Sequence, residues 1–149
     1  LVGVSIVLMV IGFKSADHID LWYPPAMLTH VNNLMVLIAI WMMSPAGQKG
    51  KLLSKVRHPM LMGFRVWAAA HLLVNGDLAG IVLFGGLLAW GVAEVPVINK
   101  SEPAWTPRTD GSLAKDGMFL VASIFLHYLA IIHWLSQWLF VPCLNVLLL

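Results

Sequence analysis

Long apolar runs separated by short polar stretches set the pattern of this sequence. Five runs carry few or no charged side chains and are bounded by proline, glycine or clustered polar residues: 1–13, 26–43, 60–74, 78–92 and 118–140. Such runs predict helices that are apolar on every face and are therefore buried in lipid or in a protein core. The first run is shorter than the roughly 20 residues of a membrane span. We therefore expect the chain to begin partway through a longer protein.

The third and fourth runs are separated only by Asn75-Gly76-Asp77. Asn-Gly favours a tight reversal, with Gly76 at positive φ, and Asp77 can cap the helix that follows. Residues 60–92 therefore predict a helical hairpin. A single kinked helix is the alternative, which three consecutive turn-forming residues disfavour.

Basic side chains gather in two of the connections between the runs. Seven of them lie there, against one in the connection after the first run: Lys49, Lys51, Lys55, Arg57, Lys100, Arg108 and Lys115, against Lys14. Five alternating spans would bring both basic connections to the same side of a membrane. Because cytoplasmic loops of membrane proteins are enriched in Lys and Arg, we expect residues 44–58 and 94–117 to be cytoplasmic.

Composition narrows the protein class. The chain is 60% hydrophobic and 11% charged, whereas a soluble domain is about 25% charged. The single Cys143 excludes a disulfide scaffold, and a net charge of +2 argues against nucleic acid as a partner. The sequence predicts an all-α polytopic transmembrane bundle of about five spans, with residues 1–149 in one membrane domain surrounded by lipids.

Histidine is the residue type that points to chemistry. His30, His71, His127 and His133 lie inside apolar runs, and His58 precedes Pro59. Ionisable groups at membrane depth usually face the bundle interior and often bind a ligand, and imidazole is a common axial ligand of haem iron. Counting from the cytoplasmic side, His71 lies about 17 Å deep and His133 about 23 Å deep. With His30 they are expected in one outer layer. The alternative is that each imidazole hydrogen-bonds a neighbouring helix.

Arg65 is the one guanidinium inside an apolar run. At that depth it needs a carboxylate, a carbonyl cluster, a haem propionate or a lipid phosphate. The pattern places no Asp or Glu level with it. Its partner is therefore expected on another chain, on a cofactor or at the interface that a long side chain can reach. The sequence lacks the Walker A, CxxC, HExxH and GxSxG motifs, so the catalytic residues, if any, are unknown.

A composite motif resembles the signature of the NnrU family. It comprises Arg57-His58-Pro59-Met60, Gly63, Trp67, Ala70-His71-Leu72-Leu73, Asn75-Gly76-Asp77-Leu78-Ala79, Leu83-Phe84-Gly85-Gly86 and Ala89-Trp90, with Trp22-Tyr23-Pro24-Pro25 upstream. The resemblance covers most of residues 20–95 and is weaker beyond Val95. NnrU proteins are bacterial integral-membrane proteins linked to nitrite and nitric oxide reduction in denitrification. The resemblance therefore implies a multi-pass protein of the bacterial inner membrane.

The same superfamily includes 15-cis-zeta-carotene isomerase, a haem b enzyme. There, an Arg-His-Pro motif and a His thirteen residues later mark one helix, and His58 and His71 have this spacing here. The resemblance implies His71 as a haem b ligand and His58 as a supporting residue. His133 is the preferred second ligand within the chain. The rival source is an upstream helix that the relatives carry and this sequence lacks. Arg65 and His30 complete the candidate cofactor-binding set.

Three functions follow from these patterns. The first is a haem b-binding NnrU protein linked to nitrite and nitric oxide reduction. The second is a haem-dependent isomerase acting on an apolar polyene. The third is a non-catalytic subunit of a larger membrane complex, since glycines allow helices to approach closely. The glycines concerned are Gly63, Gly80, Gly85, Gly86 and Gly91.

Overall fold

The structure, a computed structural model, describes the backbone of residues 2–17 and 19–147 and the side chains of residues 3–17 and 19–133. In this part of the chain every regular element is a helix. The helices are α1 (Val2–Ser15), α2 (Met27–Met43), α3 (Ala46–Lys49), α4 (Pro59–Val74), α5 (Leu78–Ser101) and α6 (Leu113–Leu147). The all-helical fold expected from the apolar runs is confirmed, with the short α3 as an addition.

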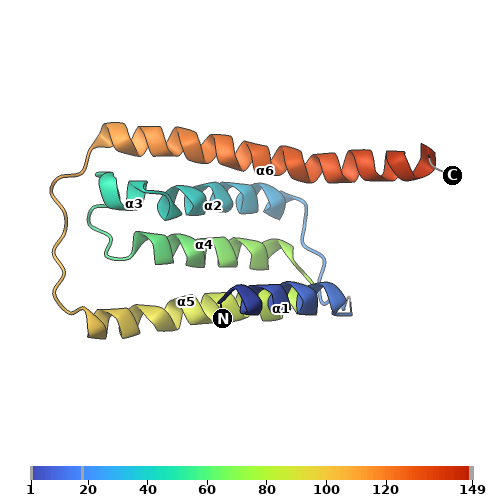
Figure 1. Cartoon of the computed structure of the whole chain (residues 1–149), viewed down its shortest axis with the longest axis horizontal. Coiled ribbons are helices and arrows are strands. Elements are labelled where there is room, and N and C mark those ends of the chain that lie inside the picture. Colours follow the sequence, from blue (N-terminus) through green and yellow to red (C-terminus); the bar gives the residue numbers. More distant parts are fainter. Residues whose placement is uncertain (1, 18, 148–149) are drawn as a thin grey trace.

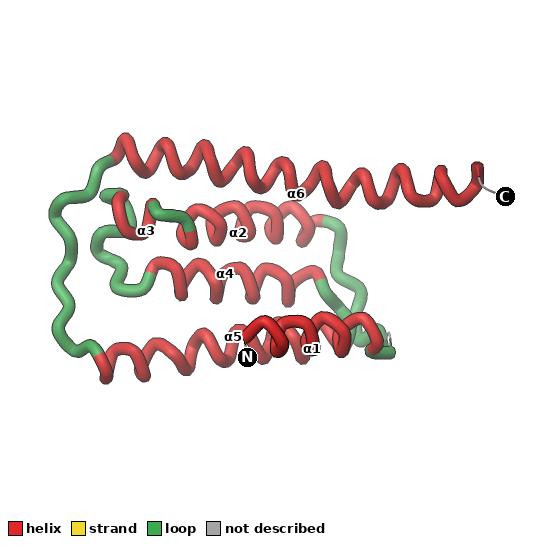
Figure 2. The backbone as a smooth tube through the Cα atoms, viewed as in Figure 1, coloured by secondary structure: helices red, strands yellow, loops and turns green. Residues whose placement is uncertain are grey.

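The long helices lie side by side in the order α6, α2, α4, α5 (Figure 1). The α2–α4 pair makes the most extensive contact, α6 packs on α2 and α3, and α1 contacts only α5 among the described helices. The segments 44–58 and 102–112 meet at one end of the bundle, which we term the loop end. The segments 19–26 and 75–77 meet at the opposite end, which we term the turn end (Figure 2). This grouping of connections agrees with the one expected from alternating helices.

Small residues explain the close α2–α4 contact. A Cβ atom added to Gly63 of α4 would lie 2.8 Å from the Ala39 carbonyl oxygen and 2.9 Å from the Met42 side chain, both on α2. Ala39 and Ala68 are fully buried in the same bundle. Helices without large side chains at their contact can bring their backbones together and gain dispersion energy. Gly63 therefore sets the α2–α4 separation.

The break at residues 75–77 is confirmed, but one detail of the prediction was wrong. The Asp77 Oδ1 accepts a hydrogen bond from the Gly80 N–H at 2.7 Å, as a helix cap. No glycine in the described residues has positive φ. Instead the Gly76 carbonyl accepts from the Leu21 and Trp22 N–H groups. A Cβ on Gly76 would lie 1.9 Å from the Trp22 oxygen, so glycine is required here for close approach.

Two predicted helix boundaries were wrong. The run ending at residue 92 continues to Ser101, through Pro96. The run expected over 118–140 begins at Leu113 and ends at Leu147. A proline removes one backbone donor, and apolar helices tolerate this where neighbouring turns and chains compensate. The longer α5 places Glu94 inside a helix rather than in a loop.

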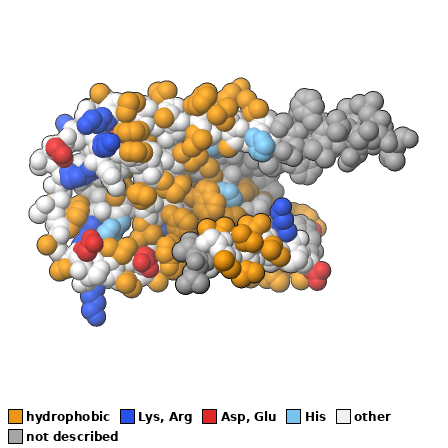
Figure 3. All heavy atoms as spheres, in the orientation of Figure 1, with side chains coloured by type: hydrophobic (Ala, Val, Ile, Leu, Met, Phe, Trp, Pro, Cys, Tyr) orange, Lys and Arg blue, Asp and Glu red, His pale blue; other side chains and the backbone are white. Residues whose placement is uncertain are grey.

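Two helices are long and apolar enough to cross a membrane, Leu78–Ser101 and Leu113–His133. Three further apolar helices, α1, α2 and α4, are shorter. The expectation of about five membrane spans is therefore not confirmed. Only 11% of each long apolar stretch is buried in the structure. Hydrophobic side chains consequently cover much of the surface (Figure 3). An apolar surface of this extent needs lipid or partner chains to cover it.

Candidate functional site

His71 lies near the end of α4 and is half-buried. Its Nδ1 is 2.9 Å from the Trp67 carbonyl oxygen, one turn earlier. Because a carbonyl can only accept, Nδ1 donates in this hydrogen bond, and a neutral ring with its proton there would carry a lone pair on Nε2. Within the described residues no hydrogen bond to Nε2 is found. This is the tautomer in which a helical imidazole ligates a metal, with its other nitrogen held by a carbonyl.

Aromatic side chains fix the His71 ring between α4 and α5. The ring centroid lies 4.6 Å from that of Trp67 and 4.7 Å from that of Phe84 on α5. Phe64 contacts Trp67 at 5.9 Å and Trp90 at 5.5 Å, between ring centroids. We call these four rings and His71 the aromatic cluster. Its apolar contacts orient the imidazole ring.

The structure does not bring His71 and His133 together. His133 is on α6, which packs on α2 and α3, and α2 lies between α6 and α4 (Figure 1). His133 and His30 are both exposed, and His127 is half-buried on α6. His30 lies in the first turn of α2, the helix that packs directly on α4. The structure leaves His18 outside the described residues.

A buried polar atom without a partner lies level with His71. The Asn32 Oδ1 is buried and accepts no hydrogen bond from the described residues. The Gly63–Ala39 contact sets the register of α2 and α4, which run antiparallel. Asn32 lies seven residues before Ala39 on α2, and Ala70 lies seven residues after Gly63 on α4. Asn32 is therefore level with Ala70, the neighbour of His71. Buried acceptors are normally satisfied. A donor from water or a ligand is therefore expected at this level.

Arg65 lies in the middle of α4 and is half-buried against α5. A Cβ on Gly91 would lie 3.0 Å from the Arg65 Cγ, so this glycine makes room for the arginine stem. Glu94 follows Gly91 by three residues and is also half-buried. The expectation of no acidic residue near this depth was wrong, because it depended on α5 ending at residue 92. No hydrogen bond to the Arg65 guanidinium is found in the part of the chain described.

His58 belongs to a different part of the bundle. It precedes α4 at the loop end, and its Nε2 lies 2.8 Å from the Asn99 Oδ1 of α5. The amide oxygen accepts, so Nε2 donates. His58 and His71 are separated by thirteen residues, or about 20 Å along a helix at 1.5 Å per residue. His58 can support α4, but it does not reach the aromatic cluster.

Asp116 is a buried carboxylate within residues 94–117, which the sequence pattern assigned to a cytoplasmic connection. It is 3% exposed, and its Oδ2 accepts from the Lys51 and Leu52 N–H groups at 2.7 and 3.0 Å. Its own carbonyl accepts from the Trp41 Nε1 at 3.3 Å. A Cβ on Gly50 would collide with Oδ1 at 1.8 Å. The spacing of 65 residues gives no local signal, so only the fold reveals this contact.

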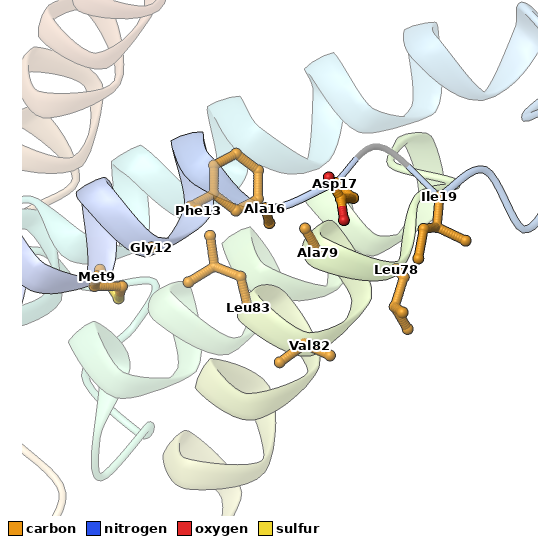
Figure 4. A pocket seen from close by; sticks show the side chains of 10 residues that line it. All are labelled: Met9, Gly12, Phe13, Ala16, Asp17, Ile19, Leu78, Ala79, Val82 and Leu83. Atoms are coloured by element: carbon orange, nitrogen blue, oxygen red, sulfur yellow. The ribbon is translucent and has the colours of Figure 1, made fainter.

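An open groove of about 460 Å³ lies between α1 and α5 at the turn end. Figure 4 shows Met9 and Phe13 of α1 facing Leu83 of α5 across it, with Asp17 near one end. Leu83 lines the groove, while the next residue, Phe84, contacts His71. The groove and the aromatic cluster therefore occupy neighbouring faces of α5.

Comparison with known families decides the relationship of the chain. The match is to the family described as NnrU protein, over residues 1–143. The chain belongs to the NnrU family. Membership confirms the resemblance and extends it beyond the central motif to nearly the whole chain. The comparisons with curated proteins and with solved structures gave no match.

The NnrU motif maps onto one compact part of the fold. Arg57-His58-Pro59 begins α4, His71 lies near its end, and Asn75-Gly76-Asp77 forms the turn into α5. The motif therefore covers both ends of the α4–α5 hairpin, including the aromatic cluster between the two helices.

Proposed function

We propose that this NnrU-family chain is a multi-pass protein of the bacterial inner membrane in which His71 would hold the iron of a haem b. One observation carries the proposal: the hydrogen bond from the His71 Nδ1 to the Trp67 carbonyl leaves Nε2 free to ligate. The family membership supports the membrane setting and a link to nitrite and nitric oxide reduction. When bound, haem b supplies a redox-active iron.

In this proposal His71 would hold the haem iron, and neighbouring side chains would form part of the surroundings of the group. His71 offers an oriented nitrogen beside aromatic rings, and Asn32 offers a buried acceptor at the same level. Arg65 lies six residues before His71, about 9 Å along the helix, and its guanidinium suits a propionate. The helix order separates His133 from His71. His30, or a residue from outside the described chain, is therefore the better second ligand.

The membrane setting rests on surface chemistry and charge. Only 11% of the apolar stretch of α5, and of the described part of α6, is buried in the structure, and lipid removes the cost of exposing apolar side chains. Seven of the eight basic residues in the connections between the apolar runs lie toward the loop end, where blue side chains gather in Figure 3. By the positive-inside rule this end, with residues 44–58 and 94–117, is cytoplasmic.

A non-catalytic subunit is the second candidate, and one observation favours it. A Cβ on Gly63 or Gly91 would meet a neighbouring helix, but a Cβ on Gly85 or Gly86 would meet nothing within 4 Å. Packing within the described chain therefore does not explain this glycine pair. Adjacent small residues on an apolar helix suit close approach of another helix. A polyene isomerase is a weaker candidate, supported only by the apolar groove between α1 and α5.

A visible spectrum tests the haem proposal. The full chain, expressed in a bacterial membrane and purified in mild detergent, is expected to show a Soret band. His71→Ala is expected to lower the haem-to-protein ratio at least tenfold while the amount of protein in the membrane stays constant. His127→Ala removes another half-buried histidine and is expected to keep the band. An unchanged Soret band in His71→Ala, or a colourless wild-type protein, contradicts the proposal and favours the subunit.

A further inference from the structure

A second cavity, of about 490 Å³, opens at the loop end beside the start of α4. Arg57, His58 and Arg108 line it together with Gln48, Met60 and Trp105. None of its ten lining residues is Asp or Glu. The volume lies within the range of about 300–1,000 Å³ typical of small-ligand sites. The cavity thus has the size of a ligand site and a basic lining.

Both guanidiniums are held in place without being neutralised. The Arg57 Nη2 donates to the Glu102 carbonyl, and the Arg108 Nη2 donates to the Gly47 carbonyl at 2.6 Å. Both side chains are half-buried, and the described residues provide no ion pair to either one. A guanidinium has five N–H donors, so each keeps donors for a further acceptor. Two pre-oriented arginines beside one cavity favour a phosphate or carboxylate.

Part of the remaining lining is apolar and open to the surroundings. Met60 is 53% exposed and Trp105 is 38% exposed, and both line the same cavity as the arginines. Tryptophan suits the boundary between headgroups and acyl chains, because its ring is apolar and its N–H is polar. The cavity therefore joins a cationic part to an apolar rim, which a free inorganic anion does not need.

We propose that this cavity binds the phosphate of an anionic phospholipid headgroup. Arg57 and Arg108 contact the phosphate oxygens, and Met60 and Trp105 contact the glycerol and the first acyl carbons. The other basic residues of the loop end raise the local concentration of anionic lipid. The inference rests on the membrane setting proposed above and is independent of haem, because His58 lies about 20 Å along α4 from His71.

Lipid retention on the full chain tests the proposal. Native mass spectrometry of the purified chain with added phosphatidylglycerol or phosphatidylcholine is expected to show at least tenfold tighter retention of phosphatidylglycerol. Phosphatidylglycerol retention is expected to weaken about tenfold in Arg57→Gln and in Arg108→Gln. It is expected to weaken less in Arg57→Lys and Arg108→Lys, which keep the positive charge. Lys51→Gln is the matched control, since Lys51 is an exposed cation at the same end outside the cavity. It is expected to change retention less than twofold.

The outcomes separate the possible explanations. Equal retention of the two lipids would overturn the proposed site. So would an equal loss of phosphatidylglycerol retention in Lys51→Gln and Arg57→Gln, because surface charge alone would then explain the binding. Thermal stabilisation by inorganic phosphate alone, without selective lipid retention, assigns the site to a free anion and overturns the lipid. Arg108 also donates to the Gly47 carbonyl, so Arg108→Gln can unfold the protein. Helix content is therefore measured by circular dichroism for each variant. If Arg108→Gln is unfolded, the result for Arg57→Gln decides the test. The Soret band reports the haem proposal separately.

Discussion

At the loop end, the buried carboxylate of Asp116 holds together segments that are far apart in the sequence. The Asp116 carboxylate satisfies two backbone donors, at Lys51 and Leu52, and fills the space above Gly50. Its position in the first turn of α6 also suits a negative charge. Asp116 therefore joins the start of α6 to the segment between α3 and α4, and its loss affects both.

Removing the Asp116 carboxylate is expected to destabilise the protein. Asp116→Ala removes the acceptor of the Lys51 and Leu52 N–H groups. A hydrogen bond to a charged group contributes about 1.5–3 kcal/mol, so the free energy of unfolding should fall by at least about 1.5 kcal/mol. Asp116→Asn keeps a neutral acceptor and should lose less. Asp110→Ala is the control, because Asp110 is an exposed acid in the same connection. Unfolding of the three variants in mixed micelles measures the order, and equal stability of Asp116→Ala and Asp110→Ala would contradict it.

At the scale of elements, the apolar runs predicted where helices lie better than where they end. Residues 26–43 and 60–74 match α2 and α4 within one residue at each end, because Pro25 and Pro59 and the polar turns mark their limits. The prediction for residues 78–92 was wrong at its C-terminal end. Glu94 and Pro96 are residues typical of a loop, but here they continue α5. The pattern thereby missed that Glu94 is a half-buried residue of α5, three residues after the glycine that contacts Arg65.

The turn between α4 and α5 provides a test of close backbone approach. Gly76→Ala is expected to lower the free energy of unfolding by about 1 kcal/mol or more, because the new Cβ would meet the Trp22 oxygen. Gly85→Ala is the matched control: its Cβ meets open space, and alanine favours a helix by up to about 1 kcal/mol over glycine. Thermal unfolding in detergent compares them. A Gly76→Ala protein as stable as Gly85→Ala would be inconsistent with the contact.

For the whole molecule, hydropathy predicted an all-helical bundle but not which helices are neighbours. The depth estimate placed His71 and His133 in one layer, yet α2 separates their helices. A helix that is apolar on all sides has no single stripe that identifies its partner. The aromatic cluster and the Asp116 contact likewise depend on the lateral order of helices. The composite motif, by contrast, correctly marked the α4–α5 hairpin and the family.

The orientation of the whole bundle can be measured by cysteine labelling. In a Cys143→Ser background, which removes the chain's one native cysteine, Gln48→Cys and Ser112→Cys are expected to resist an impermeant reagent added outside intact cells. Tyr23→Cys, at the turn end and 83% exposed in the wild-type residue, is expected to react. The reason is the excess of basic residues at the loop end. Labelling of the first two but not the third would reverse the orientation.

The Asp116 contact also constrains the order of events during synthesis. The ribosome releases Lys51 and Leu52 long before Asp116. Their N–H groups can therefore bond the Asp116 carboxylate only after about 65 more residues have been synthesised. The Ser54 carbonyl similarly accepts from the Arg108 N–H. A nascent chain that ends before α6 can pair α2 with α4 but cannot complete the segment joining them. The loop end is therefore finished last, when the start of α6 has emerged.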